Sequence, residues 1–346
     1  MNICIVGGGF YGCYLAIKLK KKYPKSKICI YEKNKDILQE SAINNQYRLH
    51  LGFHYPRSNK TIRETFLGAN LLRKEFKKYI YFPKNNIYAI HKNSKVNFKN
   101  YIKKYSDFKI PFKIIHKEKY KNYFKDINDI EGAILTKEGT LLLKELYIDF
   151  KRKYLKNIKI FKKVQVLDIN SNGEVLIGNN QKKLYDLIIN TTHVNPNLGL
   201  NKKFFKLKFE KALMVLTKNF LNKDTAITIM DGEFISIYPL NEKLLSLSSV
   251  KHTPVVKTTS LKKLNKIKVI SKINYAKKII NDVKKYLTLP NKIDIKKITM
   301  SPKVKLINDS GDKRISSFIK KKKLISVFCG KIDAAPVLWK KIEKKL

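Results

Sequence analysis

The feature that most constrains the fold is a glycine-rich turn between an apolar strand and a helical segment near the N-terminus. Residues 2–6 form an apolar run of the kind found in buried parallel strands. Residues 7–12, GGGFYG, fit the pattern G-x-G-x-x-G, and residues 13–22 have the spacing of an amphipathic helix. A second apolar strand, 27–31, ends at Glu32. Because these parts occur in the order and at the spacing of a dinucleotide-binding unit, we predict a Rossmann-like α/β domain.

Each residue type in this unit has a physical role. Gly7 permits the tight turn, Gly9 lets the backbone approach a pyrophosphate, and Gly12 lets helix and strand pack closely. The free N–H groups at the start of the helix attract phosphates. Glu32 can accept hydrogen bonds from an adenosine ribose and would repel a 2′-phosphate, which disfavours NADP. The alternative is a loop that needs its glycines for conformation alone.

The net charge of +47 would ordinarily indicate a nucleic-acid or membrane partner. However, only six of the 74 basic residues are arginines, and the lysines are spread over nearly the whole chain. Proteins that read nucleic acids favour arginine for its bidentate and stacking contacts. We therefore expect no specific nucleic-acid partner, but we do expect salt-dependent non-specific binding.

The four cysteines, Cys4, Cys13, Cys29 and Cys329, show no CxxC spacing. This pattern predicts reduced, packed thiols in a cytoplasmic protein, with no metal site. No apolar run approaches the ~20 residues of a membrane span, so we expect no transmembrane segment.

The second informative stretch is residues 45–58, with the sequence NQYRLHLGFHYPRS. Read as an extended strand, it separates into an apolar and a polar set at period two. The apolar set, expected to pack on the core, is Tyr47, Leu49, Leu51, Phe53 and Tyr55. The polar set, expected to face a cleft, is Gln46, Arg48, His50, Gly52 and His54. Gly52 would leave room for a flat ring to approach the backbone. The alternative is a half-buried strand with a solvated polar face.

Arginines are concentrated around the same stretch. Arg48, Arg57 and Arg63 lie within sixteen residues and make up half of the arginines in the chain. Because the chain otherwise uses lysine, this clustering predicts bidentate or planar contacts that lysine cannot make.

The remaining patterns outline the rest of the fold. Residues 61–78 predict a helix with a buried stripe of Phe66, Leu67, Leu71, Leu72 and Phe76. The strand at 185–193 ends in small polar residues, as cofactor-lining strands do in open α/β sheets. Residues 205–253 are β-rich, and their hairpin of 234–239 and 244–250 is a candidate floor for a substrate pocket.

The C-terminal region returns to the α/β pattern. A strand at 324–328 is followed by a break at 329–331 and a final helix beginning near Asp333. Asp333 is the expected N-cap, and Pro336 suits the first turn.

Together these motifs resemble the FAD-dependent oxidoreductases of the D-amino acid oxidase-like superfamily. The resemblance rests on Gly7-x-Gly9-x-x-Gly12-x-x-x-Ala16 with Glu32, on residues 41–52, on 186–192 and on 328–331. It implies a discontinuous FAD-binding domain with an α/β sheet and an inserted β-rich substrate domain. The segment R-x-H-x-G-F-H-Y-P-R-S is similar to the signature of one subgroup. His193 departs from the pattern, because many members of the family have glycine at that position.

The resemblance also implies domain limits and site residues. FAD-binding parts are expected at 1–80, 138–200 and 301–346, and substrate-binding parts at 81–137 and 201–300. The implied cofactor contacts are Gly7, Gly9, Phe10, Tyr11, Gly12, Glu32, Lys33, Ser41, Asn45, Arg48, His50, Gly52, Val164, Thr191, Thr192, Gly330, Lys331 and Ile332.

The implied reaction is removal of a hydride from a carbon that bears nitrogen or oxygen, in a small polar substrate. Arg48 or Arg57 is a candidate clamp for a substrate carboxylate or phosphate. His50 or His54 is a candidate proton acceptor, although either can equally be a structural residue or a flavin contact. Lys331, beside the last helix, is a candidate positive group near the flavin pyrimidine.

Weaker pocket candidates are His252 and Tyr238, and Cys329 is a weak candidate for a covalent flavin link. Two other classes of function stay open at this level. One is a flavoenzyme without net redox change, such as a sugar mutase, and the other is a non-catalytic basic protein with a dinucleotide fold. An enzyme with NAD as its sole cofactor is a lesser alternative.

Overall fold

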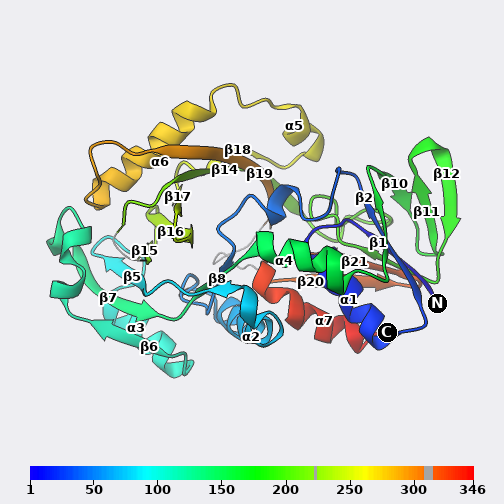
Figure 1. Cartoon of the computed structure of the whole chain (residues 1–346), viewed down its shortest axis with the longest axis horizontal. Coiled ribbons are helices and arrows are strands. Elements are labelled where there is room, and N and C mark those ends of the chain that lie inside the picture. The colour runs from blue at the N-terminus through cyan, green and yellow to red at the C-terminus, as the bar shows by residue number, and fades with distance from the viewer. Residues whose placement is uncertain (222–223, 308–314) are drawn as a thin grey trace.

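The structure is a computed structural model that describes residues 1–221, 224–307 and 315–346 (Figure 1). It is elongated, with a six-stranded sheet towards one end and a nine-stranded sheet towards the other. A three-stranded sheet, in the order β3-β8-β4, connects the two regions. Its strands are β3 (Arg48–Leu49), β8 (Gly139–Leu141) and β4 (Ile80–Tyr81). In the part of the chain that the structure describes, no helix combines the length and apolar character needed to cross a membrane.

The six-stranded sheet contains the predicted Rossmann-like unit. Its order is β20-β21-β13-β1-β2-β9, and all neighbours are parallel except β20 and β21. The strands are β1 (Asn2–Val6), β2 (Lys27–Glu32), β9 (Lys159–Lys162), β13 (Leu187–Asn190), β20 (Ser317–Lys321) and β21 (Leu324–Phe328). Helix α1 (Phe10–Lys22) connects β1 to β2, as the sequence predicts.

The two faces of this sheet are buried against different layers. Ile3 and Ile5 face the main core with α1, α2 (Asn59–Glu75), α4 (Leu143–Asp149) and α7 (Ala335–Glu343). Cys4 and Val6 face a three-stranded sheet of β10 (Val166–Ile169), β11 (Glu174–Ile177) and β12 (Gln181–Leu184). Burial on both sides explains why these strands are apolar without alternation.

The nine-stranded sheet confirms the predicted β-rich insertion. Its path is β18-β14-β17-β16-β15-β5-β7-β6, and β19 also pairs with β14. One part of the chain supplies β5 (Asn85–His91), β6 (Phe112–Ile115) and β7 (Ile130–Thr136). The other supplies β14 (Leu207–Lys218), β15 (Thr225–Met230), β16 (Ile235–Asn241), β17 (Leu244–Ser249), β18 (Pro254–Thr258) and β19 (Ile295–Leu306). The precise domain limits stay a prediction.

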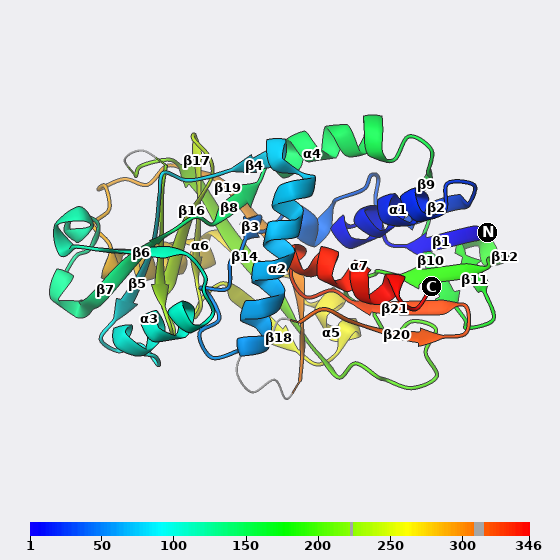
Figure 2. The same ribbon diagram turned by 90° about the horizontal axis from the view of Figure 1, so that it is seen from below.

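Helices complete this half of the molecule. Helix α6 (Lys272–Tyr286) packs on the face of the sheet that lies away from the Rossmann-like region, as Figures 1 and 2 show. Helices α3 (Phe98–Asp107) and α5 (Leu261–Lys266) flank the sheet. Short 3-10 or π turns occupy Glu40–Ala42 (η1), Lys77–Tyr79 (η2), Lys117–Lys119 (η3), Lys121–Tyr123 (η4), Ile127–Asp129 (η5), Phe150–Tyr154 (η6), Gly178–Asn180 (η7) and Ile332–Ala334 (η8).

The prediction of a long strand at 45–58 is wrong. Only Arg48 and Leu49 form a strand, and the residues after them turn towards α2. Members of both the apolar and the polar set are buried, including His50 at 6% exposure, because the segment packs against the nine-stranded sheet, α2 and α3. Gly52 also has a different role from the one predicted. Its φ is +104°, and an added Cβ atom would lie 3.0 Å from Ile62, so conformation and packing require glycine there.

Two details of the predicted helices also need correction. Helix α2 begins at Asn59 after the N-cap Ser58, and Leu67 of its predicted buried stripe is 47% exposed. The face of α2 that packs inward includes Gly68, where an added Cβ atom would lie 1.8 Å from the carbonyl oxygen of Asp333. Asp333 is not the N-cap of α7, because it lies inside η8.

Candidate functional site

The glycine-rich turn between β1 and α1 has the geometry that its predicted roles require. Gly7 has a φ of +103°, in the left-handed region that favours glycine. A Cβ atom added at Gly12 would lie 1.9 Å from the carbonyl oxygen of Gly7, so only glycine allows helix and strand to pack this closely. Among the residues that the structure describes, none lies within 4 Å of a Cβ atom added at Gly9, and none of their side chains caps α1 there. The N-terminus of α1 is therefore open to the phosphates of a ligand.

Glu32 lies buried at the end of β2, beside this turn. Its Oε2 accepts a hydrogen bond from the backbone N–H of Gly8 at 2.8 Å. Its Oε1 accepts from the backbone N–H and the side chain of Asn34, both at 2.8 Å. Val164 donates its backbone N–H to the carbonyl oxygen of Glu32 at 2.9 Å. Two of the predicted cofactor residues, Glu32 and Val164, thus meet at the C-terminal edge of the parallel strands.

Thr191 and Thr192 follow β13 at the same edge. The hydroxyl of Thr191 contacts the carbonyl oxygens of Val6 and Gly7 at 3.0 and 2.9 Å, which fixes the turn. The hydroxyl of Thr192 donates to Asn190 Oδ1 at 2.7 Å. The next residue, His193, has a φ of +49°. This is the left-handed conformation that glycine adopts most readily, so His193 departs from the expected glycine without a change of backbone conformation being required.

Two predicted cofactor residues on α1 have their side chains engaged in packing. Phe10 is buried and stacks on Phe150, with 6.2 Å between ring centroids. The hydroxyl of Tyr11 bonds to Ser316 Oγ at 2.6 Å and donates to the carbonyl oxygen of Lys331. Tyr11 therefore connects α1 to the break after β21, and a cofactor contact from Phe10 would come from its backbone.

The break after β21 contains Gly330, Lys331 and Ile332. The backbone N–H of Gly330 donates to Ser316 Oγ at 3.0 Å. Ile332 opens η8 and packs against the main core. Lys331 is half-buried, and its Nζ lies 4.8 Å from the centroid of the Tyr55 ring.

Residues 41–57, which we call the crossing segment, run across the face of the nine-stranded sheet. Its side chains bond to residues of β19, β17 and β16 and to Asp231, which follows β15. These are Ser41 to the carbonyl oxygen of Pro302 (2.6 Å), Gln46 to Ser246 (3.1 Å), Arg48 to Ser236 (3.0 Å) and Arg57 to Asp231 (2.6 Å). Within the segment, Asn45 Nδ2 donates to the carbonyl oxygen of Ser41 at 2.5 Å. Lys33, before the segment, is exposed and lies 3.7 Å from Glu40.

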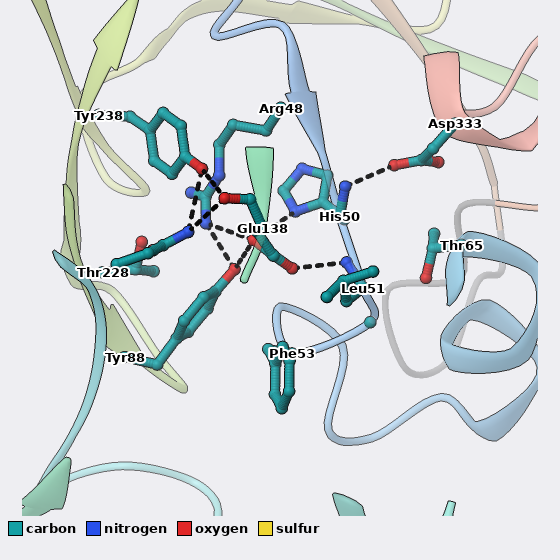
Figure 3. A network of polar contacts seen from close by, with 12 residues as sticks. Arg48, His50, Leu51, Phe53, Thr65, Tyr88, Glu138, Thr228, Tyr238 and Asp333 are labelled. Atoms are coloured by element: carbon teal, nitrogen blue, oxygen red, sulfur yellow. Dashed lines mark hydrogen bonds and ion pairs between the residues drawn. The ribbon is translucent and has the colours of Figure 1, made fainter. Parts of the chain in front are cut away.

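Arg48 and Glu138 form a buried ion pair at the centre of the molecule (Figure 3). Arg48 Nη2 lies 3.2 Å from Glu138 Oε2, and the two side chains are 2% and 0% exposed. Tyr88 donates to the same carboxylate oxygen at 2.6 Å, and the backbone N–H of Leu51 donates to Oε1 at 2.7 Å. The guanidinium also lies 4.3 Å from the ring centroid of Tyr238. Burial alone would lower the pKa of Arg48, but Tyr88 and Glu138 outweigh it and raise that pKa.

The three clustered arginines do not converge on one site. The guanidinium of Arg48 is enclosed by protein groups, which favours a structural role over a substrate clamp. Arg57 Nε lies 2.6 Å from Asp231 Oδ2, and its side chain is 38% exposed. Arg63 lies over the ring of Phe108 at 5.5 Å. Of the three, Arg57 therefore remains the better candidate for an anion contact.

His50 is held between Lys331, Asp333 and Glu138. Its backbone N–H donates to Asp333 Oδ2 at 3.1 Å, and its Nε2 lies 3.3 Å from Lys331 Nζ. Its Nδ1 lies 3.8 Å from Glu138 Oε2, so the same carboxylate faces both His50 and Arg48 (Figure 3). The rings of His54 and His50 lie 5.4 Å apart. The structure thus brings together His50, His54 and Lys331, three of the five predicted catalytic residues.

Asp333 is fully buried beside this cluster. Burial raises its pKa to about 7, although Lys331 and the hydrogen bond from His50 oppose this rise. Its Oδ1 is buried without a hydrogen-bond partner among the residues that the structure describes.

The other candidates lie apart or are engaged elsewhere. Tyr238 is buried against Arg48, and burial raises the pKa of its hydroxyl. His252 lies on the far side of β17, where its Nδ1 is 2.5 Å from Asp282 of α6. All four cysteines are free and buried, and burial raises the pKa of the Cys329 thiol, as expected for an unreactive side chain.

The sequence offered little to identify Glu138, Asp231 and Asp333 as partners of the site. Each meets its partner across a sequence separation of 87 to 283 residues. The one usable signal for these partners is the scarcity of acidic residues, since the chain has 27 acidic against 74 basic residues. An acidic residue next to an apolar strand in such a chain is a candidate for a buried ion pair.

These residues fit an adenine dinucleotide. In the described part of the chain, no residue fills the space at Gly9 and no side chain caps the N-terminus of α1, while a buried carboxylate closes β2 at the ribose position. The chain belongs to the family described as FAD dependent oxidoreductase (DAO), whose model matches residues 2–246. The predicted α/β fold, flavoprotein class and FAD cofactor are thereby confirmed, and NAD as sole cofactor is not favoured. The proposed subgroup stays a prediction.

Individual relatives agree with this assignment. FAD-dependent monooxygenase FPY4 of Fusarium mangiferae is 25% identical over 262 residues, which cover 73% of this chain and 65% of that protein. The chain therefore spans just under two thirds of this curated relative. Glycine oxidase from Geobacillus kaustophilus has a TM-score of 0.77 at 12% identity, covering 99% of this chain and 93% of that one. L-α-Glycerophosphate oxidase from Mycoplasma pneumoniae, with FAD bound, has a TM-score of 0.73 at 17% identity, with coverage of 99% and 94%. These two likenesses concern the fold.

Proposed function

We propose that this protein oxidises a small polar substrate by removing a hydride from a carbon that bears nitrogen or oxygen. FAD would supply the hydride acceptor when bound. The glycine-rich turn and Glu32 would hold its adenosine and pyrophosphate portions. The side chains of the cluster around His50 would act on the substrate.

The observation that carries this proposal is the position of His50. Its backbone is fixed by Asp333, and its ring lies between Lys331 and Glu138. Its Nε2 is close to an ammonium group, which favours a lone pair on that nitrogen over a proton. A neutral imidazole is the form that accepts a proton from an alcohol or an ammonium group. We assign His50 this task and treat His54 as a neighbour that packs on it.

Lys331 has a separate role in this proposal. It lies in the break between β21 and η8, at the C-terminal edge of the parallel sheet where ligands bind in open α/β folds. A half-buried ammonium group at this edge would stabilise negative charge that develops during the reaction.

The substrate class stays open between amines and hydroxyl compounds. One structural neighbour is a glycine oxidase and another is an L-α-glycerophosphate oxidase, so both classes need to be screened. Arg57 is the candidate for binding an acidic group of the substrate. Its guanidinium would then contact both this group and Asp231. Replacement Arg57→Lys would retain the charge but lose the bidentate geometry. We expect it to raise KM for acidic substrates and leave KM for neutral ones unchanged.

The test is anaerobic reduction of the bound flavin by a panel of amines, amino acids, hydroxy acids and sugar alcohols. Variant His50→Asn should retain the flavin spectrum of the wild type but be reduced ~100-fold or more slowly, the usual contribution of a general base. His252→Asn is the matched control, because His252 lies on the other side of β17. Flavin reduction of His50→Asn at the wild-type rate would contradict the role of His50. A colourless protein that also fails to take up FAD would refute the proposed function itself.

A further inference from the structure

Two of the four cysteines lie side by side on neighbouring strands, away from the candidate site. Cys4 of β1 and Cys29 of β2 are direct partners in the parallel pairing of these strands. Both side chains face the layer formed by β10, β11 and β12. On the other side of Cys29, its direct partner on β9 is Lys159. Cys4, Cys29 and Lys159 thus form a row across three adjacent strands.

The spacing within this row suits a disulfide. Neighbouring strands lie ~4.8 Å apart, and disulfide-bonded cysteines have Cα atoms ~4.4–6.8 Å apart. Parallel partners also point to the same face of the sheet, so the two thiols lie on one side. Neither Cys13 nor Cys329 has a cysteine as a strand partner, because Cys13 is in α1 and Cys329 follows β21.

The surroundings of Cys29 differ from those of the other thiols. Cys29 lines a surface hollow of about 410 Å³ together with Lys159, Phe161, Lys183 and Tyr185. Both lysines lie over the Phe161 ring, with Nζ to centroid distances of 4.9 and 5.2 Å, which holds their charges near Cys29. The Sγ of Cys29 is hydrogen-bonded to the hydroxyl of Tyr185 at 3.5 Å.

These groups make Cys29 the more reactive of the two thiols. The interaction with Cys4 lowers the pKa of Cys29, with help from Tyr185 and the two lysines, against the effect of burial. Cys4 is fully buried, and burial raises its pKa. Cys29 is therefore the thiol expected to react first, and Cys4 stands in register with it.

We propose that Cys4 and Cys29 form a reversible disulfide when the protein meets a hydroperoxide such as hydrogen peroxide. The Cys29 thiolate attacks one oxygen of hydrogen peroxide, so that an S–O bond forms and the O–O bond breaks, and the hydroxide that leaves takes up the proton that the Cys29 thiol had released. The sulfur of Cys4 then attacks the sulfur of Cys29, the S–O bond breaks, and the oxygen leaves as water with the proton of Cys4. Two thiols are oxidised, and one peroxide is reduced to two waters.

The disulfide would connect the two strands that carry the dinucleotide-binding residues. β1 leads directly into Gly7, and β2 ends at Glu32. The oxidised protein would therefore keep the glycine-rich turn and Glu32 at a fixed separation, and we expect slower exchange of bound FAD. The proposal itself does not depend on the substrate or on catalysis, since hydrogen peroxide can be added.

The experiment is to treat the flavin-loaded protein with hydrogen peroxide, alkylate the remaining thiols after unfolding, and measure intact and peptide masses. We expect the oxidised protein to carry two alkyl groups where the reduced protein carries four, with Cys4 and Cys29 joined in one peptide pair that has lost two hydrogen atoms and is separated by dithiothreitol. Variant Cys4→Ser should instead trap the mass of one added oxygen on Cys29. Variant Cys13→Ser is the matched control and should form the disulfide as the wild type does.

Three outcomes would overturn the proposal. One is that Cys29 is still alkylated when the peroxide-treated protein is unfolded. Another is that Cys29 is oxidised beyond the sulfenic acid without pairing, and the third is that it pairs with Cys13, Cys329 or another molecule. Because the readout is mass, it does not depend on whether any substrate reduces the flavin.

Discussion

Replacing the buried Asp333 by asparagine should change how the stability of the protein depends on pH. Asp333 is fully buried, and its pKa is raised from 3.8 to about 7. An asparagine side chain would retain an oxygen that accepts the hydrogen bond from the His50 backbone, as Asp333 Oδ2 does now. The Asp333→Asn variant therefore removes the titration while preserving the contact.

The direction in which stability changes with pH depends on whether the folded or the unfolded protein holds the Asp333 proton. The folded protein keeps Asp333 protonated up to about pH 7, whereas the unfolded chain releases the proton near pH 4. Unfolding between these values therefore releases a proton and becomes easier as pH rises. Stabilisation by the protonated group is fully present below pH ~4 and is lost as pH rises through about 7.

The magnitude follows from the same two pKa values. Each pKa unit is worth ~1.36 kcal/mol, so ionising Asp333 in the folded protein costs on the order of 4 kcal/mol. The free energy of unfolding of Asp333→Asn should therefore rise, relative to that of the wild type, by roughly 1.4 kcal/mol for each pH unit between ~4 and ~7. Above pH ~7 this difference should stay constant.

The assay is urea unfolding of the wild type and Asp333→Asn at a series of pH values from 4.5 to 8.5. Asp36→Asn is a suitable control. Burial alone would raise the pKa of Asp36, but hydrogen bonds from Tyr147, Lys162 and Lys151 outweigh it and lower that pKa. Its stabilisation is present above the unfolded pKa and is lost as pH falls through the lower folded value, so the difference in unfolding free energy between Asp36→Asn and the wild type should stay flat above pH 5. If the difference in unfolding free energy between Asp333→Asn and the wild type is also independent of pH, the raised pKa of Asp333 is refuted.

Two further perturbations test the centre of the molecule and the cofactor turn. Glu138→Gln should destabilise the protein by ~3–5 kcal/mol in thermal or urea unfolding, because it leaves Arg48 buried without a counter-charge. Adding Arg48→Met should recover part of this lost stability. If the stability losses of the two single variants simply add in the double variant, the ion-pair interpretation is contradicted. Gly12→Ala should abolish FAD retention and lower stability, since its Cβ atom would overlap the carbonyl oxygen of Gly7. Gly9→Ala should unfold like the wild type and lose only FAD affinity, as measured by flavin fluorescence titration; equal loss of stability in both glycine variants would argue against the open space at Gly9.

The parts of the fold that sequence analysis predicted are those whose causes are local. The β1–α1–β2 unit depends on glycines, an apolar strand and an acid that are close together in the chain. The last strand and helix likewise follow from a short apolar run and the proline after it. The β-rich region follows from alternation and turn residues, so its strands could be expected without knowledge of their partners.

The crossing segment shows what local patterns cannot provide. Its alternation predicted a polar face towards a cleft, with a solvated face as the alternative, but members of both sets are buried because the segment packs against the nine-stranded sheet, α2 and α3. The buried state of Arg48 depends on Glu138, Tyr88 and Ser236, which lie 90, 40 and 188 residues away in the chain. Nothing near Arg48 in the sequence identifies these partners, so its expected role as an exposed clamp could not be corrected in advance.

The way the nine-stranded sheet is assembled limits how this protein can be recombined with its relatives. Strand β5 pairs in parallel with β15, and their partners Asn85 and Thr225 are 140 residues apart. The sheet is therefore built from two separate parts of the chain, and neither part forms it alone. The crossing segment is bonded to four positions along it. A chimera that exchanges only residues 207–306 would place a foreign sheet edge against β5 and foreign side chains against Ser41, Gln46, Arg48 and Arg57. Transfer of substrate specificity between members of this fold would therefore require both sheet segments and the crossing segment to be moved together.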